Sequence, residues 1–167
     1  MVILIDAYNV IHAIRCLEET LDKGLRASRE HLIRLCQAYQ AQRGDVEKII
    51  LVFDGSTEVC PSSEPAKIRG VEVVYTETGE DADERIVEML QSRRFKIPVV
   101  VVSNDHYVSN HSRALGARVI SAAEFYAAFM RKRRSRDGSP YAESSKKVSD
   151  ALAREITAEY KRHLKID

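Results

Sequence analysis

VILID, residues 2–6, is a run of four apolar residues that ends on an aspartate. Its β-branched content and its lack of polar alternation are typical of a strand buried on both faces of a sheet. The pattern returns as IILVFD at 49–54, as VVVVSND at 99–105, and as VEVVY at 71–75, which is followed by the acidic turn GEDADE at 79–84. These runs predict four strands, each ending beside a carboxylate.

The segments between these strands have helical periodicity. Residues 28–43 carry apolar side chains every three or four positions, and Ser28 and Gly44 are the expected N-cap and stop signal. Further helices are expected at 81–94, before Leu115 and after Ser121, which has capping-box spacing to Glu124, with a last strand at 118–120. Because strands and helices alternate without a hairpin signal, we predict an α/β fold with a three-layer, doubly wound, mostly parallel sheet.

The composition changes towards the end of the chain. We expect a folded domain over residues 1–130, a basic linker or arm over 131–147, and a C-terminal helix over 148–167. The arm has a dense run of arginine and lysine at 131–136, followed by a Gly-Ser-Pro break. The last segment has apolar residues at helical spacing, so it is expected to dock on the domain or on a partner.

Composition narrows the class of protein. The chain has 167 residues, of which 44% are hydrophobic and 31% charged, as is usual for a globular domain. No apolar stretch approaches the roughly 20 residues that cross a bilayer, so we expect a cytoplasmic protein without a membrane partner. Cys16, Cys36 and Cys60 lack the spacing of a disulfide framework or a zinc site. The oligomeric state is left open.

The strand-end acids are the candidate catalytic and metal-binding residues. In a parallel sheet all strand exits lie along one edge, so carboxylates far apart in the chain would meet there and attract a divalent cation. We expect Asp6, Asp83 and Asp105 to be the catalytic residues and to bind Mg²⁺ or Mn²⁺, with Asp54 and Asp81 as further ligands, through water, or as proton acceptors.

Each acid also has a simpler interpretation. An aspartate at a strand end often begins a turn or caps the next helix, and acids at a helix entrance stabilise the helix dipole. Several like charges packed together without a cation oppose folding, however, which favours a shared ion.

Polar and basic residues around the acids are candidates for substrate binding. The small polar candidates are Asn9, Ser103 and Asn104, which either orient a phosphate or form turns. The basic candidates are Arg131, Arg133 and Arg134, which either contact RNA phosphates or form a solvated helix end. Tyr8 and Tyr107 either stack on bases or pack in the domain.

Some acidic-edge proteins do not match these motifs. A receiver domain needs paired acids after the first strand and a lysine after the last, and a haloacid-type phosphatase needs a second aspartate where Tyr8 stands. The glycine-rich signatures of nucleotide-binding folds are absent from the sequence.

Four blocks taken together resemble a known family. IDAYNVI at 5–11, VFDG at 52–55, DADERI at 81–86 and VSND at 102–105 are similar to the YacP-like branch of the NYN domains, relatives of the PIN ribonucleases. The resemblance implies a PIN-like sheet and a metal-dependent endoribonuclease using Mg²⁺ or Mn²⁺. It matches the family's acids to Asp6, Asp83 and Asp105, whereas Asp81 replaces the usual threonine. It also implies a link to ribosomes and mRNA turnover.

Two hypotheses follow. In the first, the protein hydrolyses single-stranded RNA, including mRNA associated with ribosomes, and leaves 5′-phosphate and 3′-hydroxyl ends. In the second, it is a non-catalytic RNA- or ribosome-binding module of the same fold.

Overall fold

The computed structural model describes residues 1–55, 66–68, 70–77, 79–92 and 95–136, with the backbone alone for 66–68 and 132–136. The chain divides into two compact units, Met1–Met130 and Arg131–Asp167. The last described helix runs to Arg136, so the first part of the expected arm is helical. The rest of the arm and the expected C-terminal helix lie outside the described residues, and their assignment stays a prediction.

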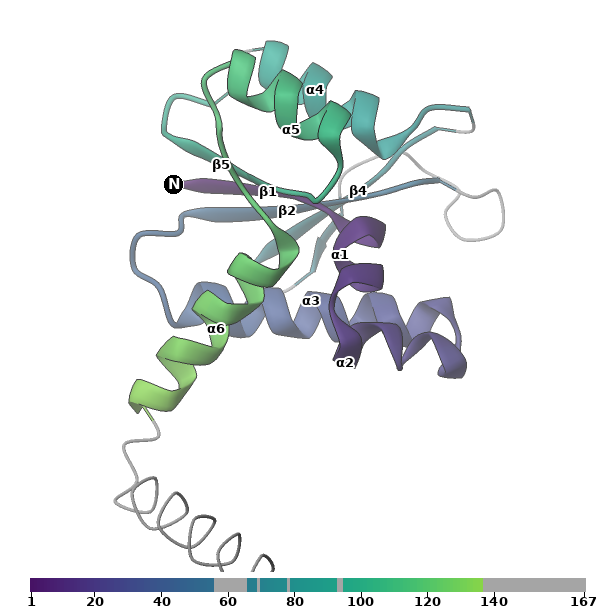
Figure 1. The fold of residues 1–167 in the computed structure, drawn as a ribbon, viewed down its shortest axis with the longest axis vertical. Helices are drawn as coiled ribbons and strands as arrows, with labels where there is room; N and C mark the ends of the chain where they lie inside the picture. Colours follow the sequence, from purple (N-terminus) through teal and green to yellow (C-terminus); the bar gives the residue numbers. More distant parts are fainter. Residues whose placement is uncertain (56–65, 69, 78, 93–94, 137–167) are drawn as a thin grey trace, which may run out of the picture. The chain divides into compact units, whose positions relative to one another are not determined.

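A six-stranded sheet forms the middle of the first unit (Figure 1). Its strands are β1 Val2–Asp6, β2 Lys48–Phe53, β3 Ala66–Ile68, β4 Val71–Tyr75, β5 Val99–Val102 and β6 Arg118–Ile120, in the order β3-β4-β2-β1-β5-β6. Five strands are parallel, which confirms the predicted mostly parallel α/β sheet. The expected absence of a hairpin was wrong, because the three-residue β3 pairs antiparallel with β4 across Gly70, whose φ is 94°. Such a short strand has too few residues for a recognisable alternation.

Helices cover both faces of the sheet. They are α1 Ala7–Ala13, α2 Arg15–Glu18, the 3₁₀ turn η1 Leu21–Lys23, α3 Leu25–Ala41, α4 Ala82–Gln91, α5 His106–Ala114 and α6 Ala122–Arg136. One core holds Ile3 and Ile5 of β1 with residues from α1, α3 and α6, whereas the other holds Leu4 with residues from α4 and α5. Figure 1 shows these two helical layers above and below the sheet. The predicted three-layer, doubly wound architecture is confirmed.

One predicted helix cap was wrong. Helix α3 begins at Leu25 with Gly24 as its N-cap, so Ser28 lies inside the helix. The Ser28 hydroxyl is buried and donates a hydrogen bond of 3.0 Å to the carbonyl of Leu17. Tertiary packing on α2 therefore decides the role of this serine, and local sequence does not reveal it.

The predicted capping box at the start of α6 is confirmed. The Ser121 N–H donates to Glu124 Oε2 at 2.7 Å, and the Glu124 N–H donates to Ser121 Oγ at 3.1 Å. This reciprocal pair fixes where the chain leaves β6.

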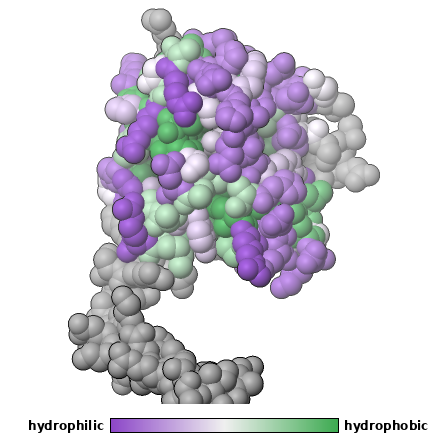
Figure 2. Space-filling view, viewed as in Figure 1, coloured by the Kyte–Doolittle hydropathy of each residue, from purple (hydrophilic) through white to green (hydrophobic). Residues whose placement is uncertain are grey.

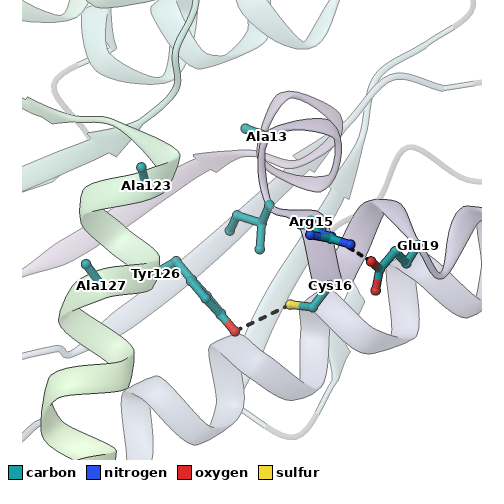
Figure 3. A pocket seen from close by; sticks show the side chains of 8 residues that line it. Ala13, Arg15, Cys16, Glu19, Ala123, Tyr126 and Ala127 are labelled. Carbon is teal, nitrogen blue, oxygen red and sulfur yellow. Dashed lines mark hydrogen bonds and ion pairs between the residues drawn. The ribbon is translucent and has the colours of Figure 1, made fainter. Parts of the chain in front are cut away.

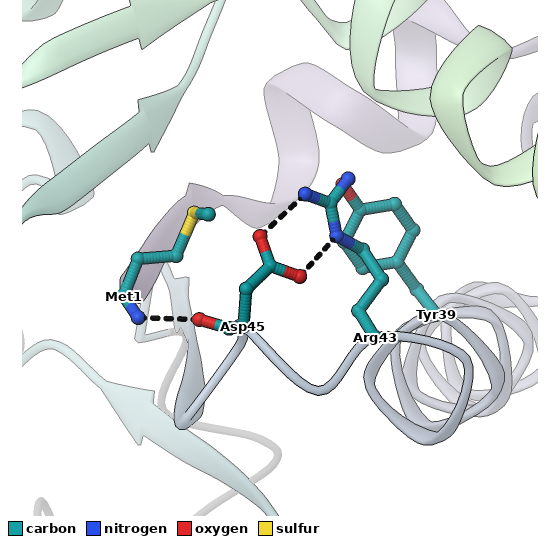
Figure 4. A network of polar contacts seen from close by, with 4 residues as sticks. All are labelled: Met1, Tyr39, Arg43 and Asp45. Carbon is teal, nitrogen blue, oxygen red and sulfur yellow. Dashed lines mark hydrogen bonds and ion pairs between the residues drawn. The ribbon is translucent and has the colours of Figure 1, made fainter.

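A polar network lies at the edge of the sheet where strands β1 and β2 begin (Figure 4). Arg43, just after α3, binds both carboxylate oxygens of Asp45, at 2.8 and 2.6 Å, and donates to the Tyr39 hydroxyl at 3.0 Å. The amino group of Met1 donates to the Asp45 carbonyl at 2.5 Å. These contacts set the starting points of β1 and β2, and thereby the register that brings their far ends together.

The exterior is mainly hydrophilic. Figure 2 shows polar side chains over most of the visible face, interrupted by small apolar areas. None of the helices in the described ranges combines the length and the hydropathy needed to cross a membrane.

Candidate active site

The candidate site lies where the strand order reverses. Strand β1 stands between β2 and β5, and the helices that follow β1 and β5 cover opposite faces of the sheet. In such sheets ligands bind in the crevice at the carboxyl ends of the strands, at this reversal. Asp6 ends β1 beside Val52 of β2, and Ser103 follows the residue of β5 that pairs with Ile5. The register therefore brings the three strand exits together.

Asp6 is the most enclosed acid of the site. It is 5% exposed, its Oδ1 accepts the Asn9 N–H at 3.3 Å, and its Oδ2 accepts the Ser103 hydroxyl at 3.0 Å. The pKa of Asp6 is raised to about 6, mainly by burial. The hydrogen bonds from Ser103 and Asn9 oppose this shift, and the charges of Asp83 and Asp54 contribute to it. Asp6 thus combines an N-cap for α1 with an energetically costly buried charge.

Asp105 is linked to Asp6 through one hydroxyl. Ser103 Oγ accepts the backbone N–H of Asp105 at 3.0 Å while it donates to Asp6. Asp105 Oδ1 in turn accepts the Val108 N–H at 3.0 Å and caps α5. Ser103 therefore fixes the spacing between two of the predicted catalytic acids.

Asp54 caps a helix that begins far along the chain. Its Oδ1 accepts the N–H of Ala82, the first residue of α4, at 2.6 Å. The neighbouring Gly55 N–H donates to Thr76 Oγ1 at 2.8 Å, and a Cβ on Gly55 would come within 1.8 Å of the Thr76 carbonyl oxygen. Asp81 is the N-cap residue of α4, but its side chain makes no capping hydrogen bond. The exit of β2 is thus tied directly to the acidic turn.

Asp83 connects the acids electrostatically. Its half-buried position raises its pKa, and the charges of Asp105, Asp54 and Asp81 raise the pKa further. Within the described part of the chain, Asp83 makes no hydrogen bond or ion pair. Asp83 is therefore within electrostatic reach of each of the other four predicted acids.

The small polar candidates mainly hold the site together. Asn9 Oδ1 accepts the Asn104 N–H at 2.8 Å, and Asn104 Oδ1 accepts the Ala122 N–H at 3.0 Å. These bonds connect α1, the exit of β5 and the start of α6, so both amide oxygens have a structural role through long-range contacts and not through local turns. Substrate binding by these residues stays a prediction. Arg131 is exposed, whereas the side chains of Arg133 and Arg134 lie outside the described residues.

The chemistry of the acids fits a hard cation, but their present arrangement is not a ligand shell. Carboxylate oxygens are the ligands that Mg²⁺ and Mn²⁺ prefer, and Asp83 has no protein partner in the described ranges. Among the described residues, no three His, Cys, Asp or Glu side chains stand close enough together to hold a metal ion. A helix N–H donates a hydrogen bond to one carboxylate oxygen of each of Asp6, Asp54 and Asp105, as the capping interpretation expected. Their role as ligands stays a prediction.

Sequence reasoning missed one charged residue near this edge. Arg29 of α3 is 5% exposed and donates through Nε to the Tyr8 hydroxyl at 2.8 Å. It precedes Leu32 and Ile33 by three and four positions, so it lies on the apolar stripe of the helix. A charged residue on the apolar stripe of a helix is a signal that the helical periodicity of the sequence already contained.

A separate cavity of about 410 Å³ lies between α1–α2 and α6 (Figure 3). The Cys16 thiol and the Tyr126 hydroxyl meet across it at 3.5 Å, and alanines line much of its wall. None of the five acids lines this cavity, so it is distinct from the acidic edge.

Comparisons with known proteins place the chain in a family. The family model for the YacP-like NYN domain matches residues 3–165. YacP of Bacillus subtilis (strain 168), which is described as uncharacterized, is 32% identical over 91 residues; that match covers 54% of this chain and only 52% of the relative.

Two crystal structures of Rae1 (YacP) from Bacillus subtilis share the fold. A mutant form has 26% identity and a TM-score of 0.67, with 93% of this chain and 89% of that chain covered. Another Rae1 structure has 25% identity and a TM-score of 0.66, with 99% and 95% covered. The family has the PIN-like nuclease fold, so a nuclease is the class of function that it indicates. The chain belongs to the YacP-like NYN domain family.

Proposed function

We propose that the protein is a metal-dependent endoribonuclease that hydrolyses phosphodiester bonds of single-stranded RNA, including mRNA on ribosomes, in the cytoplasm. One observation carries the proposal. Acids from three strand exits and from the entrance of α4 gather at the reversal of the sheet, where burial and, to a smaller extent, their mutual charges raise the pKa values of Asp6 and Asp83. Natural selection for stability alone does not favour such repulsion, whereas a cation-dependent site requires it.

In this proposal Asp6, Asp83 and Asp105 hold Mg²⁺ or Mn²⁺, with Asp54 and Asp81 as further ligands or proton acceptors. A divalent ion held by these residues would supply charge to neutralise the phosphate and would lower the pKa of the attacking water. Ser103 holds the Asp6 carboxylate and the Asp105 backbone at a fixed spacing through its two hydrogen bonds.

The helix entrances help an anionic substrate to approach. Asp6, Asp81 and Asp105 are the N-cap residues of α1, α4 and α5, so three helices begin at this edge. The positive ends of the helix dipoles offset part of the carboxylate charge and favour phosphate. The basic run that begins at Arg131 would contact the RNA backbone, with Arg133 and Arg134 as the further candidates.

Cleavage of an end-labelled, unstructured RNA tests the proposal. The wild-type protein should cut it with Mn²⁺ and not with a chelator, leaving 5′-phosphate and 3′-hydroxyl ends. Asp6→Asn should abolish cutting, whereas Asp22→Asn, which changes an exposed aspartate of η1, should cut normally. Equal activity of Asp6→Asn and wild type would exclude this mechanism. Asp6→Asn, purified in the same way, also controls for a contaminating nuclease, and Asp22→Asn shows that replacing an aspartate elsewhere does not by itself stop cutting.

The second candidate is a non-catalytic RNA- or ribosome-binding module. The capping bonds of Asp6, Asp54 and Asp105 favour it, because they give these acids a structural role without chemistry. It predicts that the protein binds RNA, that Mn²⁺ never produces cleavage, and that Asp6→Asn binds as wild type does. Charge reversal across 131–136 should weaken binding if the basic run docks on the target.

A further inference from the structure

Arg29 is a buried cation that has no carboxylate partner among the described residues. Its side chain is enclosed by the domain, and its Nε and Nη2 both donate to the hydroxyl oxygen of Tyr8. No acid of the described residues forms an ion pair with it. Buried arginines are normally paired, because removing a charge from water is costly.

Three aromatic rings surround the guanidinium. Its Cζ lies 5.5 Å from the ring centre of Tyr8 and 5.8 Å from those of Phe53 and Tyr75. Phe53 packs edge-on against Tyr8 at 5.4 Å and stacks on Tyr75 at 5.5 Å. The ring faces attract a cation, but they do not neutralise its charge.

This aromatic cage is built from residues that are close to the acids in the chain. Tyr8 is two residues after Asp6, Phe53 immediately precedes Asp54, and Tyr75 ends β4 next to Phe53. Nevertheless, Arg29 is not among the charges that shift the pKa of Asp6 or of Asp83. The segments that hold Arg29 thus also carry acids of the site, but Arg29 pairs with none of the acids in the described part of the chain.

Two hydrogen-bond donors of the pair remain available. The Tyr8 oxygen accepts both bonds from Arg29, so its own O–H is left to donate, and no described residue accepts it. Nη1 of Arg29 has no hydrogen bond in the described part of the chain, and it is absent from the fully buried unsatisfied atoms there, Gln42 Oε1 and Ser112 Oγ. Nη1 therefore keeps contact with solvent.

We propose that Arg29 and Tyr8 form a phosphate-binding pair that holds the RNA backbone at the α3 side of the acidic edge. Arg29 supplies the charge and Nη1, and Tyr8 donates its O–H, which the guanidinium polarises. The inference rests on the proposed function only in taking RNA as the source of the phosphate. The pair positions the backbone and takes no part in bond cleavage.

RNA binding without cleavage tests the pair. Fluorescence anisotropy of a labelled oligouridylate is measured in chelator over a range of salt concentrations, with Asp6→Asn as the parent protein. Tyr8→Phe keeps the ring in the cage and removes only the hydroxyl. Arg29→Met keeps an apolar stem, and Arg34→Met removes the same charge from an exposed position on α3.

The two cage variants should bind RNA about tenfold more weakly than the parent. Arg29→Met should also lower the slope of log affinity against log salt by about 0.7, the value for one phosphate contact on a single strand, and Arg34→Met should leave the slope unchanged. If the cage only joins α1 to α3, the variants should have a lower melting temperature, with unchanged affinity for RNA and an unchanged salt dependence of that affinity. That result in folded Tyr8→Phe would overturn the inference, even if Arg29→Met failed to fold.

The outcomes separate this inference from the proposed function. If the cage variants bind RNA more weakly as predicted but the wild-type protein never cleaves RNA, the phosphate-binding pair is retained and the nuclease is refuted. If the wild type cleaves RNA with Mn²⁺ but Tyr8→Phe binds RNA with full affinity, the nuclease is retained and the pair is refuted. A parent protein that binds no RNA would refute the pair as well.

Discussion

Replacing Asp6 by asparagine should stabilise the metal-free protein at neutral and alkaline pH. The folded state raises the pKa of Asp6 from 3.8 to about 6, mainly through burial, so the folded protein holds this proton more tightly than the unfolded chain. Stability therefore falls as pH rises through this interval, and the loss is complete above it. A pKa difference of this size corresponds to about 3 kcal/mol.

Asparagine keeps the geometry of the site without its charge. Its oxygen can accept the Asn9 N–H, and its amide can donate to Ser103 Oγ, in place of the two bonds that Asp6 makes now. We therefore expect Asp6→Asn to gain up to about 3 kcal/mol at pH about 8 in chelator, and almost nothing at pH about 4, where Asp6 is protonated in both states.

Urea unfolding at these two pH values measures the difference. With a typical slope of about 1–3 kcal/mol per molar urea, the midpoint of Asp6→Asn should rise by about 1 M or more at the higher pH. Asp22→Asn, at an exposed position, is the matched control and should change little. An Asp6→Asn protein that is less stable than wild type at pH about 8 would refute the reasoning, because the ionised carboxylate would then stabilise the fold.

Three further outcomes follow from the same contacts. Ser103→Ala removes the hydroxyl that lowers the pKa of Asp6, so cleavage activity should require a higher pH than in wild type. The free energy of unfolding should fall by about 1–3 kcal/mol. An unchanged pH profile of cleavage would contradict this. Gly55→Ala should destabilise the protein by about 1–3 kcal/mol, because its Cβ meets the Thr76 carbonyl, and denaturant melts of wild-type stability would exclude that clash. In wild type, cleavage should rise with pH through about 6 as Asp6 ionises, so a rate that does not change across this range would argue against Asp6 as a ligand.

The parallel strands could be predicted because each is a short, continuous apolar run. Val71–Tyr75 and Val99–Val102 have the predicted bounds, since buried strands of a parallel sheet are apolar on both faces. The helices between 7 and 23 were not predicted, because α1, α2 and η1 are too short to show a clear period.

The site could be predicted only as far as strand ends are visible in the sequence. Strand order places the exits of β2, β1 and β5 side by side, and this follows from the predicted doubly wound sheet. That Asp54 caps α4, and that Arg29 is enclosed by rings from three separate segments, depends on how the sheet edge packs. Such long-range contacts leave no local pattern.

The central claim is that acids from separate segments bind one divalent cation at the carboxyl edge of the sheet. The most direct measurement is the anomalous difference density of a crystal of the wild-type protein soaked in Mn²⁺. The account predicts a peak in contact with Asp6, Asp83 and Asp105 that is lost in Asp6→Asn. Side chains that point apart, with no peak between them at saturating Mn²⁺, would contradict it.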